Sequence, residues 1–385
     1  MAASVFLLFI DFTRENSLVP TRIIIDGNDE AAASHSTHIR FRESVLFEFS
    51  SLPETPAFAV VYRESCLISF LNELSVPVVS GRSVIGSLKF RVTEAIEPVA
   101  IDCKRINLDS RPVFIGHRGL GANKLGVQVR ENTLESFNEA MKHDRLAGIE
   151  LHVMLTQDGK LAVFHDMLYP VNINHRNAKL PISSLLYDRD MSSDSPQDQV
   201  PLLEDVLRNL DPPTAGIVIE IKYPTNDAIR MHPGLGKYSR SKLVTSVLDT
   251  LVKFQKFIAD RWLVLSSFDP DIVWLLSDAL RGSPILLLHN VWFGHEDQAD
   301  GESLGHFKDT RNGDPGIAVS QARLLDTGMA FEADYVLTHA FREHFSESSL
   351  PMFSYGSMNL DLNNLRKQID MHAFFIDNMD LLERF

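Results

Sequence analysis

From Pro112 to the C-terminus the sequence alternates short apolar segments with stretches of helical periodicity, and this alternation constrains the fold more than any other feature. It is typical of parallel α/β architecture, in which each strand is followed by a helix that covers the sheet. We predict strands at Val113–Gly116, Ile149–Leu155, Leu161–His165, Ile217–Lys222, Trp262–Phe268, Ile285–His289, Tyr335–Thr338, Met352–Tyr355 and Phe374–Ile376. Nine candidates within residues 111–385 are close to the eight strands of a (β/α)8 TIM barrel, which is the fold we predict.

One place departs from a regular barrel. Only Thr156–Lys160, with a turn at Asp158-Gly159, separates the predicted strands Ile149–Leu155 and Leu161–His165. A crossover between parallel strands needs a dozen or more residues. Either the crossover helix is missing and the barrel is distorted there, or the second strand runs antiparallel, so we expect a somewhat irregular barrel.

Helix-start signals support the alternation. Thr133–His143 follows Asn132, with Glu135 three residues further on, which predicts a capping box with Asn132 as the N-cap. The segment Pro270–Leu280 opens with Asp269 as its predicted N-cap. A third helix is predicted over Lys242–Ile258, where apolar residues recur at helical spacing.

Residues 1–110 have a different rhythm and predict a small β-rich domain followed by a linker. Short apolar or alternating segments are separated by polar or Pro/Gly residues; they are Val5–Phe12, Arg22–Ile25, Val45–Phe49, Ala57–Tyr62 and Ser87–Thr93. His35 and His38 lie in a small polar stretch that we interpret as a loop rather than as a pair of metal ligands.

Composition limits the partners and the compartment. The formal net charge of −14 argues against a nucleic-acid partner, because nucleic-acid binding draws its affinity from a basic surface. Two cysteines, Cys66 and Cys103, do not make a disulfide framework and favour a reducing compartment. Val5–Ile10 is apolar but is followed at once by Asp11, so it indicates a strand rather than a signal peptide. No apolar run approaches the length of a membrane span, and we expect a cytoplasmic protein.

The chemistry is concentrated where polar residues interrupt or follow the predicted strands. These residues are His117 and Arg118, Glu150 and His152, His165 and Asp166, and Glu220 and Lys222. In a barrel the carboxyl ends of the strands meet at one mouth, where catalytic groups collect. A hard cation held by carboxylates, together with Arg and Lys, neutralises a phosphate, and two histidines supply a base and an acid. The set therefore suits phosphodiester hydrolysis, although histidines and carboxylates also occur in other metal-dependent hydrolases.

The order of the motifs resembles the glycerophosphodiester phosphodiesterase family, and most closely its eukaryotic glycerophosphocholine branch. The motifs, which extend through residues 112–385, are His117-Arg118-Gly119, Glu131-Asn132-Thr133, Gly148-Ile149-Glu150, Thr156-Gln157-Asp158-Gly159, His165-Asp166, Pro201-Leu202-Leu203-Glu204-Asp205, Glu220-Ile221-Lys222, Ser267-Phe268 and Phe375-Ile376-Asp377. The resemblance implies metal-dependent hydrolysis of a small-molecule glycerophosphodiester, with glycerophosphocholine as the expected substrate and sn-glycerol 3-phosphate and the free alcohol as products.

The resemblance also implies roles for individual residues. His117 and His165 correspond to the acid/base pair, Glu150 and Glu220 to ligands of Mg2+ or Ca2+, and Arg118 and Lys222 to phosphate contacts. Near the end, where the family usually has a Trp-Thr-Val-Asn-like strand, this chain departs and reads Phe353-Ser354-Tyr355. Tyr355 either replaces the Trp as an apolar wall of the substrate cleft or is an aromatic residue of the barrel core, and Phe268 allows the same two interpretations. Protein partners are not indicated.

The departure from the family is His152, which stands where the family has an aspartate as the third metal ligand. Imidazole binds hard cations poorly and prefers transition metals. Three interpretations stay open: a metal held by Glu150 and Glu220 with water in the gap, a shift toward Mn2+ or Zn2+, or loss of metal and activity. Besides the enzyme, the sequence thus allows a catalytically impaired barrel that acts through protein contacts. A phosphatidylinositol-type phospholipase also uses two histidines, but no exposed apolar or basic stretch supplies the membrane-binding face it needs.

Overall fold

The computed structural model divides the chain into two units, Met1–Glu97 and Pro98–Phe385. It describes residues 6–10, 22–25, 28–30, 37–41, 44–49, 57–62, 73–80, 83–109, 112–123, 129–173, 176–193, 199–280, 284–289, 315–345, 349–368 and 370–385. Cys66, His35 and the polar stretch around residues 294–314 lie outside these ranges, and each unit is described here by itself.

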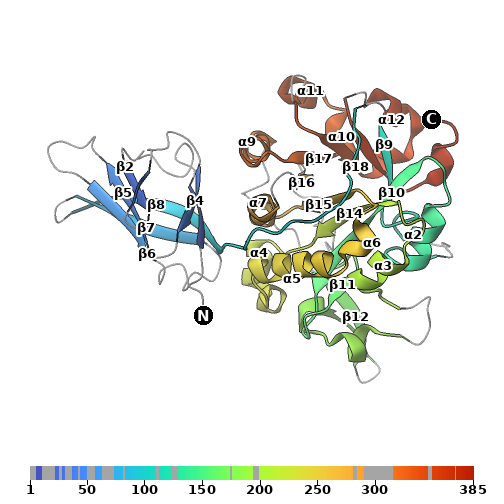
Figure 1. Cartoon of the computed structure of the whole chain (residues 1–385), viewed down its shortest axis with the longest axis horizontal. Helices are drawn as coiled ribbons and strands as arrows, with labels where there is room; N and C mark the ends of the chain where they lie inside the picture. Colours follow the sequence, from blue (N-terminus) through green and yellow to red (C-terminus); the bar gives the residue numbers. More distant parts are fainter. Residues whose placement is uncertain are drawn as a thin grey trace. The chain divides into compact units, whose positions relative to one another are not determined.

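The first unit is an antiparallel sheet with the strand order β3-β2-β5-β6-β7-β8-β1-β4 (Figure 1). Its strands are β1 (Phe6–Ile10), β2 (Arg22–Ile25), β3 (Asn28–Glu30), β4 (Thr37–Phe41), β5 (Ser44–Phe49), β6 (Ala57–Tyr62), β7 (Glu73–Ser80) and β8 (Ser83–Glu94). The β-rich character predicted from the sequence is confirmed. His38 does not lie in a loop, because it belongs to β4 and is paired with Phe9 of β1.

The second unit is a closed barrel of parallel strands in the order β9-β10-β14-β15-β16-β17-β18-β19, with β19 paired to β9 (Figure 1). Its strands are β9 (Val113–Gly116), β10 (Leu146–Leu155), β14 (Gly216–Ile221), β15 (Leu263–Ser267), β16 (Ile285–His289), β17 (Gly328–Glu332), β18 (Met352–Tyr355) and β19 (Ala373–Ile376). The predicted TIM barrel is confirmed. Residues 98–109, which the sequence places with the linker, contact the barrel, where the backbone N–H of Lys104 donates to the carbonyl of Arg261.

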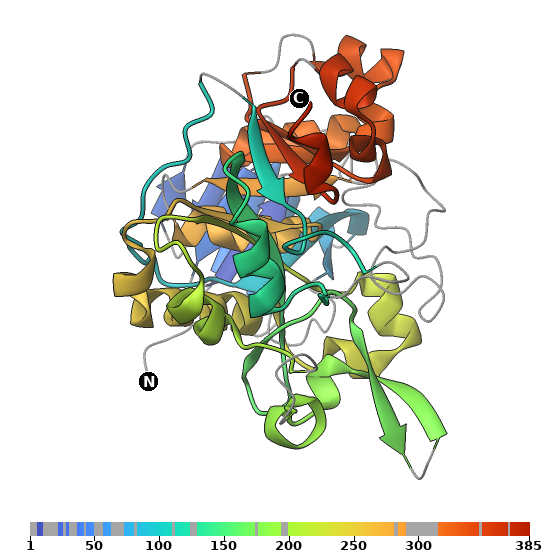
Figure 2. The same cartoon turned by 90° about the vertical axis from the view of Figure 1, so that its right-hand side faces the viewer.

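The irregular connection is an antiparallel hairpin. Strand β11 (Leu161–Val163) turns back on β10 and pairs Val153 with Val163. Gly159 adopts a positive φ of 77°, and the Thr156 hydroxyl donates to the Lys160 carbonyl, which closes the turn. The chain then forms a second hairpin of β12 (Leu168–Ile173) and β13 (Arg176–Pro181), which Figure 2 shows in light green projecting from the barrel.

One predicted strand is wrong. Tyr335–Thr338 does not form a strand, because the chain is helical there in α10 (Ala333–Val336), and the sixth barrel strand is β17, which ends just before it. Tyr335 packs with Phe331 and Phe341 in an aromatic cluster, at ring-centroid distances of 6.2 and 5.5 Å. A short apolar run does not distinguish a strand from a buried helical turn, and packing decides between them.

Helices follow most barrel strands: α2 (Leu134–Ala140), α3 (Leu203–Asn209), α4 (Asn226–Met231), α5 (Arg240–Lys253), α6 (Gln255–Ile258), α7 (Pro270–Ala279), α9 (Pro315–Leu325), α10, α11 (His339–Phe345) and α12 (Leu362–Lys367). Short 3-10 or π turns are η1 (Ile182–Ser184), η2 (Tyr187–Met191), η3 (Pro233–Gly236), η4 (Ser357–Leu360) and η5 (Met379–Leu381). Asp269 caps α7 as predicted. The N-cap of α2 is Thr133 rather than Asn132, because the Thr133 hydroxyl accepts the Ser136 N–H.

The barrel interior is filled by apolar side chains that alternate along the strands. A single core cluster contains Ile115 of β9, Val218 of β14, Ala330 of β17 and Phe353 of β18. Because successive side chains of a strand point to opposite faces, the residues two positions further along also face the interior. These residues are His117, Glu220, Glu332 and Tyr355, and they form the layer of the barrel at its carboxyl-terminal mouth.

Candidate active site

His117 follows β9 and is held by a carboxylate from the last barrel strand. Its Nδ1 lies 2.7 Å from Oδ1 of Asp377, and that oxygen also accepts the Ala122 backbone N–H at 2.8 Å. Burial lowers the pKa of His117, but the carboxylates of Asp377 and Glu150 outweigh burial and leave this pKa above its ordinary value. Asp377 belongs to a sequence motif, but the sequence analysis assigns it no role. Its position directly after a strand is the signal that could have identified it as a site residue.

His165 follows β11, and its surroundings favour the neutral imidazole, unlike those of His117. Its Nε2 lies 2.8 Å from Nη2 of Arg118 and 3.5 Å from Nζ of Lys222, and its Nδ1 lies 2.8 Å from Oδ1 of Asp166. A guanidinium only donates, so Nε2 accepts and Nδ1–H donates to Asp166. Burial and the cations Lys222 and Arg118 hold the pKa of His165 well below its ordinary value. Environments that separate two titratable groups in this way suit an acid and a base.

Arg118 joins the two histidines. Its Nε lies 3.3 Å from Nε2 of His117, and its Nη1 lies 3.0 Å from Oε1 of Glu131. The backbone of Arg118 adopts a positive φ of 53°, and its N–H donates to Oε2 of Glu150 at 3.3 Å. Glu131 therefore orients a phosphate-contact candidate in addition to lying at the entry of α2.

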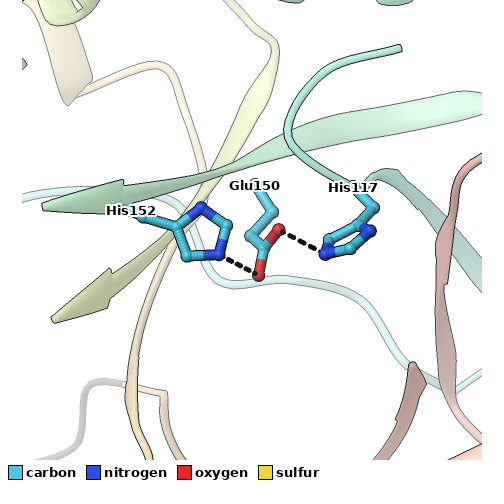
Figure 3. Close-up of side chains that lie close together, drawn as sticks. All are labelled: His117, Glu150 and His152. Carbon is cyan, nitrogen blue, oxygen red and sulfur yellow. Dashed lines mark ion pairs between the residues drawn. The ribbon is translucent and has the colours of Figure 1, made fainter. Parts of the chain in front are cut away.

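Glu150 and His152 come from the same face of β10 and meet His117 (Figure 3). Nε2 of His117 lies 3.7 Å from Oε2 of Glu150, and Nε2 of His152 lies 3.6 Å from Oε1 of the same carboxylate. One potential ligand atom from each of the three residues lies within 4.8 Å of the other two. All three side chains are largely buried, so the group is shielded from bulk water.

Glu220 contacts this group through His152, because its Oε2 lies 3.3 Å from Nε2 of that histidine. Its Oε1 lies 3.6 Å from Nζ of Lys222. Burial raises the pKa of Glu220, but Lys222 and His152 together lower it to about 2. Glu220 is therefore an anion beside a lysine in the metal-free protein.

Asn132 is a site residue that sequence reasoning missed. Its backbone has a positive φ of 54°, and its Oδ1 lies 3.3 Å from the backbone N and 3.2 Å from Nδ1 of His152. With Nδ1–H donated to Asn132, Nε2 of His152 faces Glu150 and Glu220. Nε2 carries a proton when it bridges these carboxylates, and its lone pair is available to a metal ion once that proton is lost. One imidazole nitrogen and two carboxylates form a donor set that fits a divalent transition metal.

Phe268 and Tyr355 lie together at the top of the barrel core. Their ring centroids are 5.9 Å apart with the planes at 90°, and the Tyr355 hydroxyl donates to the His289 carbonyl at 2.9 Å. Both rings belong to the apolar cluster of the barrel. Both rings therefore belong to the barrel core and lie in its layer nearest the mouth.

Comparisons with known proteins find phosphodiesterases of related sequence. A Caenorhabditis elegans homologue of a glycerophosphocholine phosphodiesterase, GPCPD1 homolog 1, is 25% identical over 46% of this chain and 32% of its own length. The Schizosaccharomyces pombe glycerophosphocholine phosphodiesterase gde1 is 24% identical over 70% of this chain and 28% of its own length. The chain thus spans about a third of the length of these relatives.

A solved structure shows the same fold. A phosphodiesterase of Oleispira antarctica, in complex with its product sn-glycerol-3-phosphate, superposes with a TM-score of 0.51 at 15% identity, covering 71% of this chain and 96% of that one. In the part of the chain that the structure describes, no helix has both the length and the apolar character to cross a membrane. The model of the glycerophosphoryl diester phosphodiesterase family matches residues 117–381, which are more than half of the sequence, and the chain belongs to that family.

Proposed function

We propose that this protein hydrolyses glycerophosphodiesters, with glycerophosphocholine as the principal substrate, to sn-glycerol 3-phosphate and the free alcohol. The observation that carries the proposal is the convergence of two histidines of opposite pKa shift on one arginine at the barrel mouth. Family membership and the names of the two relatives support the substrate class. The cysteine usage favours the cytoplasm as its compartment.

In the proposed reaction, Arg118 and Lys222 contact the phosphate and neutralise part of its charge. Nε2 of His165, which carries a lone pair, takes the proton from the attacking nucleophile. This nucleophile is either water, or a glycerol hydroxyl that forms a cyclic phosphate, which water then opens to sn-glycerol 3-phosphate. His117, whose pKa is raised by Asp377 against the effect of burial, gives a proton to the leaving alcohol. Phe268 and Tyr355 form the apolar wall beside the reacting group.

Glu150, His152 and Glu220 are the proposed ligands of a divalent cation, and the His117–Glu150–His152 group supports a site at this position. The cation supplies charge neutralisation of the phosphate when bound. Family resemblance favours Mg2+ or Ca2+, whereas the nitrogen donor of His152 favours Mn2+ or Zn2+.

A second candidate function follows from the same histidine. Nε2 of His152 lies 3.3 Å from Glu220 and 3.6 Å from Glu150, so the imidazole bridges two carboxylates that an aspartate would repel. A barrel held together in this way is stable without metal, and it then acts through protein contacts without turnover.

Choline release from glycerophosphocholine, measured with Mg2+, Mn2+, Ca2+, Zn2+ or EDTA, separates the two functions. We expect turnover by the wild type with at least one metal and a loss of about 100-fold or more in His117→Ala and His165→Ala. His143→Ala, which changes a histidine after α2, is the matched control. Turnover by His152→Asp but not by the wild type under any condition would establish the inactive barrel instead.

A further inference from the structure

A buried carboxylate lies across the barrel mouth from the histidines. Glu332 is the last residue of β17, and in the sheet order β17 is four strands from β10 in either direction around the barrel. Ala330 belongs to the interior core cluster, so Glu332 faces the interior one layer closer to the mouth. The residue is only 9% exposed. The mouth therefore has a second acidic position opposite Glu150.

One aromatic ring lies beside this carboxylate, and a second ring packs against the first. Tyr355 of β18 is in register with Glu332, and its hydroxyl donates to the carbonyl of His289 at the end of β16. Because β17 lies between β16 and β18, the Tyr355 side chain crosses the end of β17 next to Glu332. Phe268 packs edge-to-face against Tyr355 at 5.9 Å.

The backbone leaves room for the Glu332 side chain. Gly356 has a φ of 104°, and a Cβ at this position would lie 3.2 Å from Cγ of Glu332. Burial raises the pKa of Tyr355, with Glu332 and Glu220 adding to the shift, so the hydroxyl stays neutral. The rings therefore present neutral π faces and edges beside one negative charge.

The two cations assigned to the phosphate lie together in one half of the mouth. Arg118 and Lys222 both contact His165, on the side where the phosphate reacts. A carboxylate beside a pair of packed aromatic rings is instead an environment that attracts an alkylammonium group, through ionic and cation–π attraction. In a phosphodiester of a cationic alcohol, the negative phosphate would face Arg118 and Lys222 and the positive group would face Glu332, so the charges of substrate and mouth are complementary.

We propose that Glu332, Tyr355 and Phe268 form the binding site for the ammonium group of the leaving alcohol. The enzyme then selects glycerophosphodiesters of cationic alcohols, choline or ethanolamine, over those of neutral alcohols. This inference rests on the proposed function, and it adds Glu332 as the residue that determines specificity.

The test compares kcat/KM for glycerophosphocholine with kcat/KM for glycerophosphoglycerol, whose alcohol is neutral. We expect Glu332→Gln to lower the ratio of the two values about tenfold, because an ionic partner of the ammonium is lost. Glu332→Asp, which keeps the charge, retains a preference for glycerophosphocholine and shows that the fold is intact. Glu139→Gln, on α2, removes the same charge at a site where Glu139 pairs with Lys142, and leaves the ratio unchanged. An equal loss on both substrates in Glu332→Gln would place Glu332 at the glycerol half and overturn the proposal.

The aromatic part of the site has its own pair of variants. Tyr355→Phe keeps the ring and we expect it to keep most of the ratio, whereas Tyr355→Leu removes the ring and lowers it. Equal ratios in Tyr355→Leu and the wild type would contradict the aromatic contribution.

Direct binding distinguishes a failure of this inference from a failure of the proposed function. If the wild type hydrolyses neither substrate, calorimetric titration with choline still tests the site. Binding that is weakened about tenfold in Glu332→Gln supports the site, and choline binding that is absent or unchanged in the variant overturns it.

Discussion

Individual residues at the mouth act by fixing the protonation and direction of their neighbours. Asn132 shows this most clearly, since its side chain determines which nitrogen of His152 faces Glu150 and Glu220. The positive φ that brings Asn132 into position is tolerated by asparagine better than by most residues. We therefore expect the affinity of the proposed metal site to depend on Asn132, which is not itself a proposed ligand.

We predict that Asn132→Gly weakens Mn2+ binding about tenfold or more, because the loss of a partner that orients a metal-ligating histidine has effects of roughly this size. Glycine accepts the positive φ, so the variant removes the side chain without straining the backbone. Titration of the metal-free protein with Mn2+ measures the effect. Asp326→Gly is the matched control, because Asp326 has a φ of 52° away from the mouth. Equal affinities in Asn132→Gly and the wild type would exclude the orienting role.

A second prediction concerns Asp377. In Asp377→Asn the carboxylate that raises the pKa of His117 is neutralised, so this pKa falls. If His117 is the acid, the alkaline limb of the pH profile of kcat/KM moves to lower pH, and kcat falls at least about tenfold. Asp380→Asn, three residues along the chain and exposed, is the control. An alkaline limb that stays in place would show that His117 is not the acid.

At the scale of elements, the hydrophobic pattern predicted most barrel strands and the antiparallel alternative for β11. It missed β17, because its sequence Gly-Met-Ala-Phe-Glu has a glycine at one end and a charge at the other, whereas the apolar run at Tyr335 is helical. The first turn of α2 was predicted one residue too early. Asn132 and Thr133 are both good N-caps by composition, and only the tertiary contact of Asn132 with His152 assigns the cap to Thr133.

The candidate residues that the sequence predicts are those that lie within or directly after apolar strands. The structure brings together His117, Glu150, His152, His165 and Glu220, and the sequence predicts these five residues as site candidates because each interrupts or follows an apolar segment. The sequence does not show that Glu332 lies near Tyr355 and Phe268. The strand β17 is not predicted from the sequence, and its register with β18 is seen only in the structure. Asp377 follows the last barrel strand and His117 follows the first, so their contact joins residues that are far apart in the sequence. Such long-range contacts leave no local pattern.

The cap itself gives a prediction for α2. Thr133→Ala removes the acceptor for the Ser136 N–H, and we expect a loss of about 1 kcal/mol in the free energy of unfolding. Thr250→Ala in α5 is the control, because its hydroxyl donates to the Ser246 carbonyl within the helix and we expect an effect within about 0.5 kcal/mol. Urea denaturation of both variants measures the difference, and equal stabilities would assign the cap elsewhere.

At the scale of the molecule, the net charge of −14 and the chemistry of the mouth are compatible because charge is distributed unevenly. Arg118 and Lys222 are buried beside the histidines, where they act at short range in a medium of low polarity. The overall negative charge therefore does not exclude an anionic substrate from the proposed site.

The buried acids predict the response of the whole barrel to acid. The pKa of Glu220 falls from 4.5 to about 2 on folding, so the group stabilises the folded state above pH 4.5 and this contribution disappears as the pH falls toward about 2. In metal-free protein we expect the free energy of unfolding to decrease through this window. Glu220→Gln, which does not ionise, shows a smaller decrease between pH 5 and pH 3 in urea denaturation, and the same decrease as the wild type would refute the assignment.

The β10–β11 hairpin gathers Glu150, His152 and His165 onto one uninterrupted piece of chain. In a barrel built from separate βα units, metal ligands and base would be spread over different units and would have to change one by one. In the proposed site, this one hairpin supplies two of the three metal ligands together with the base, and only Glu220 comes from another strand, β14. A rigid shift of the hairpin would therefore move the base and most of the proposed metal site together.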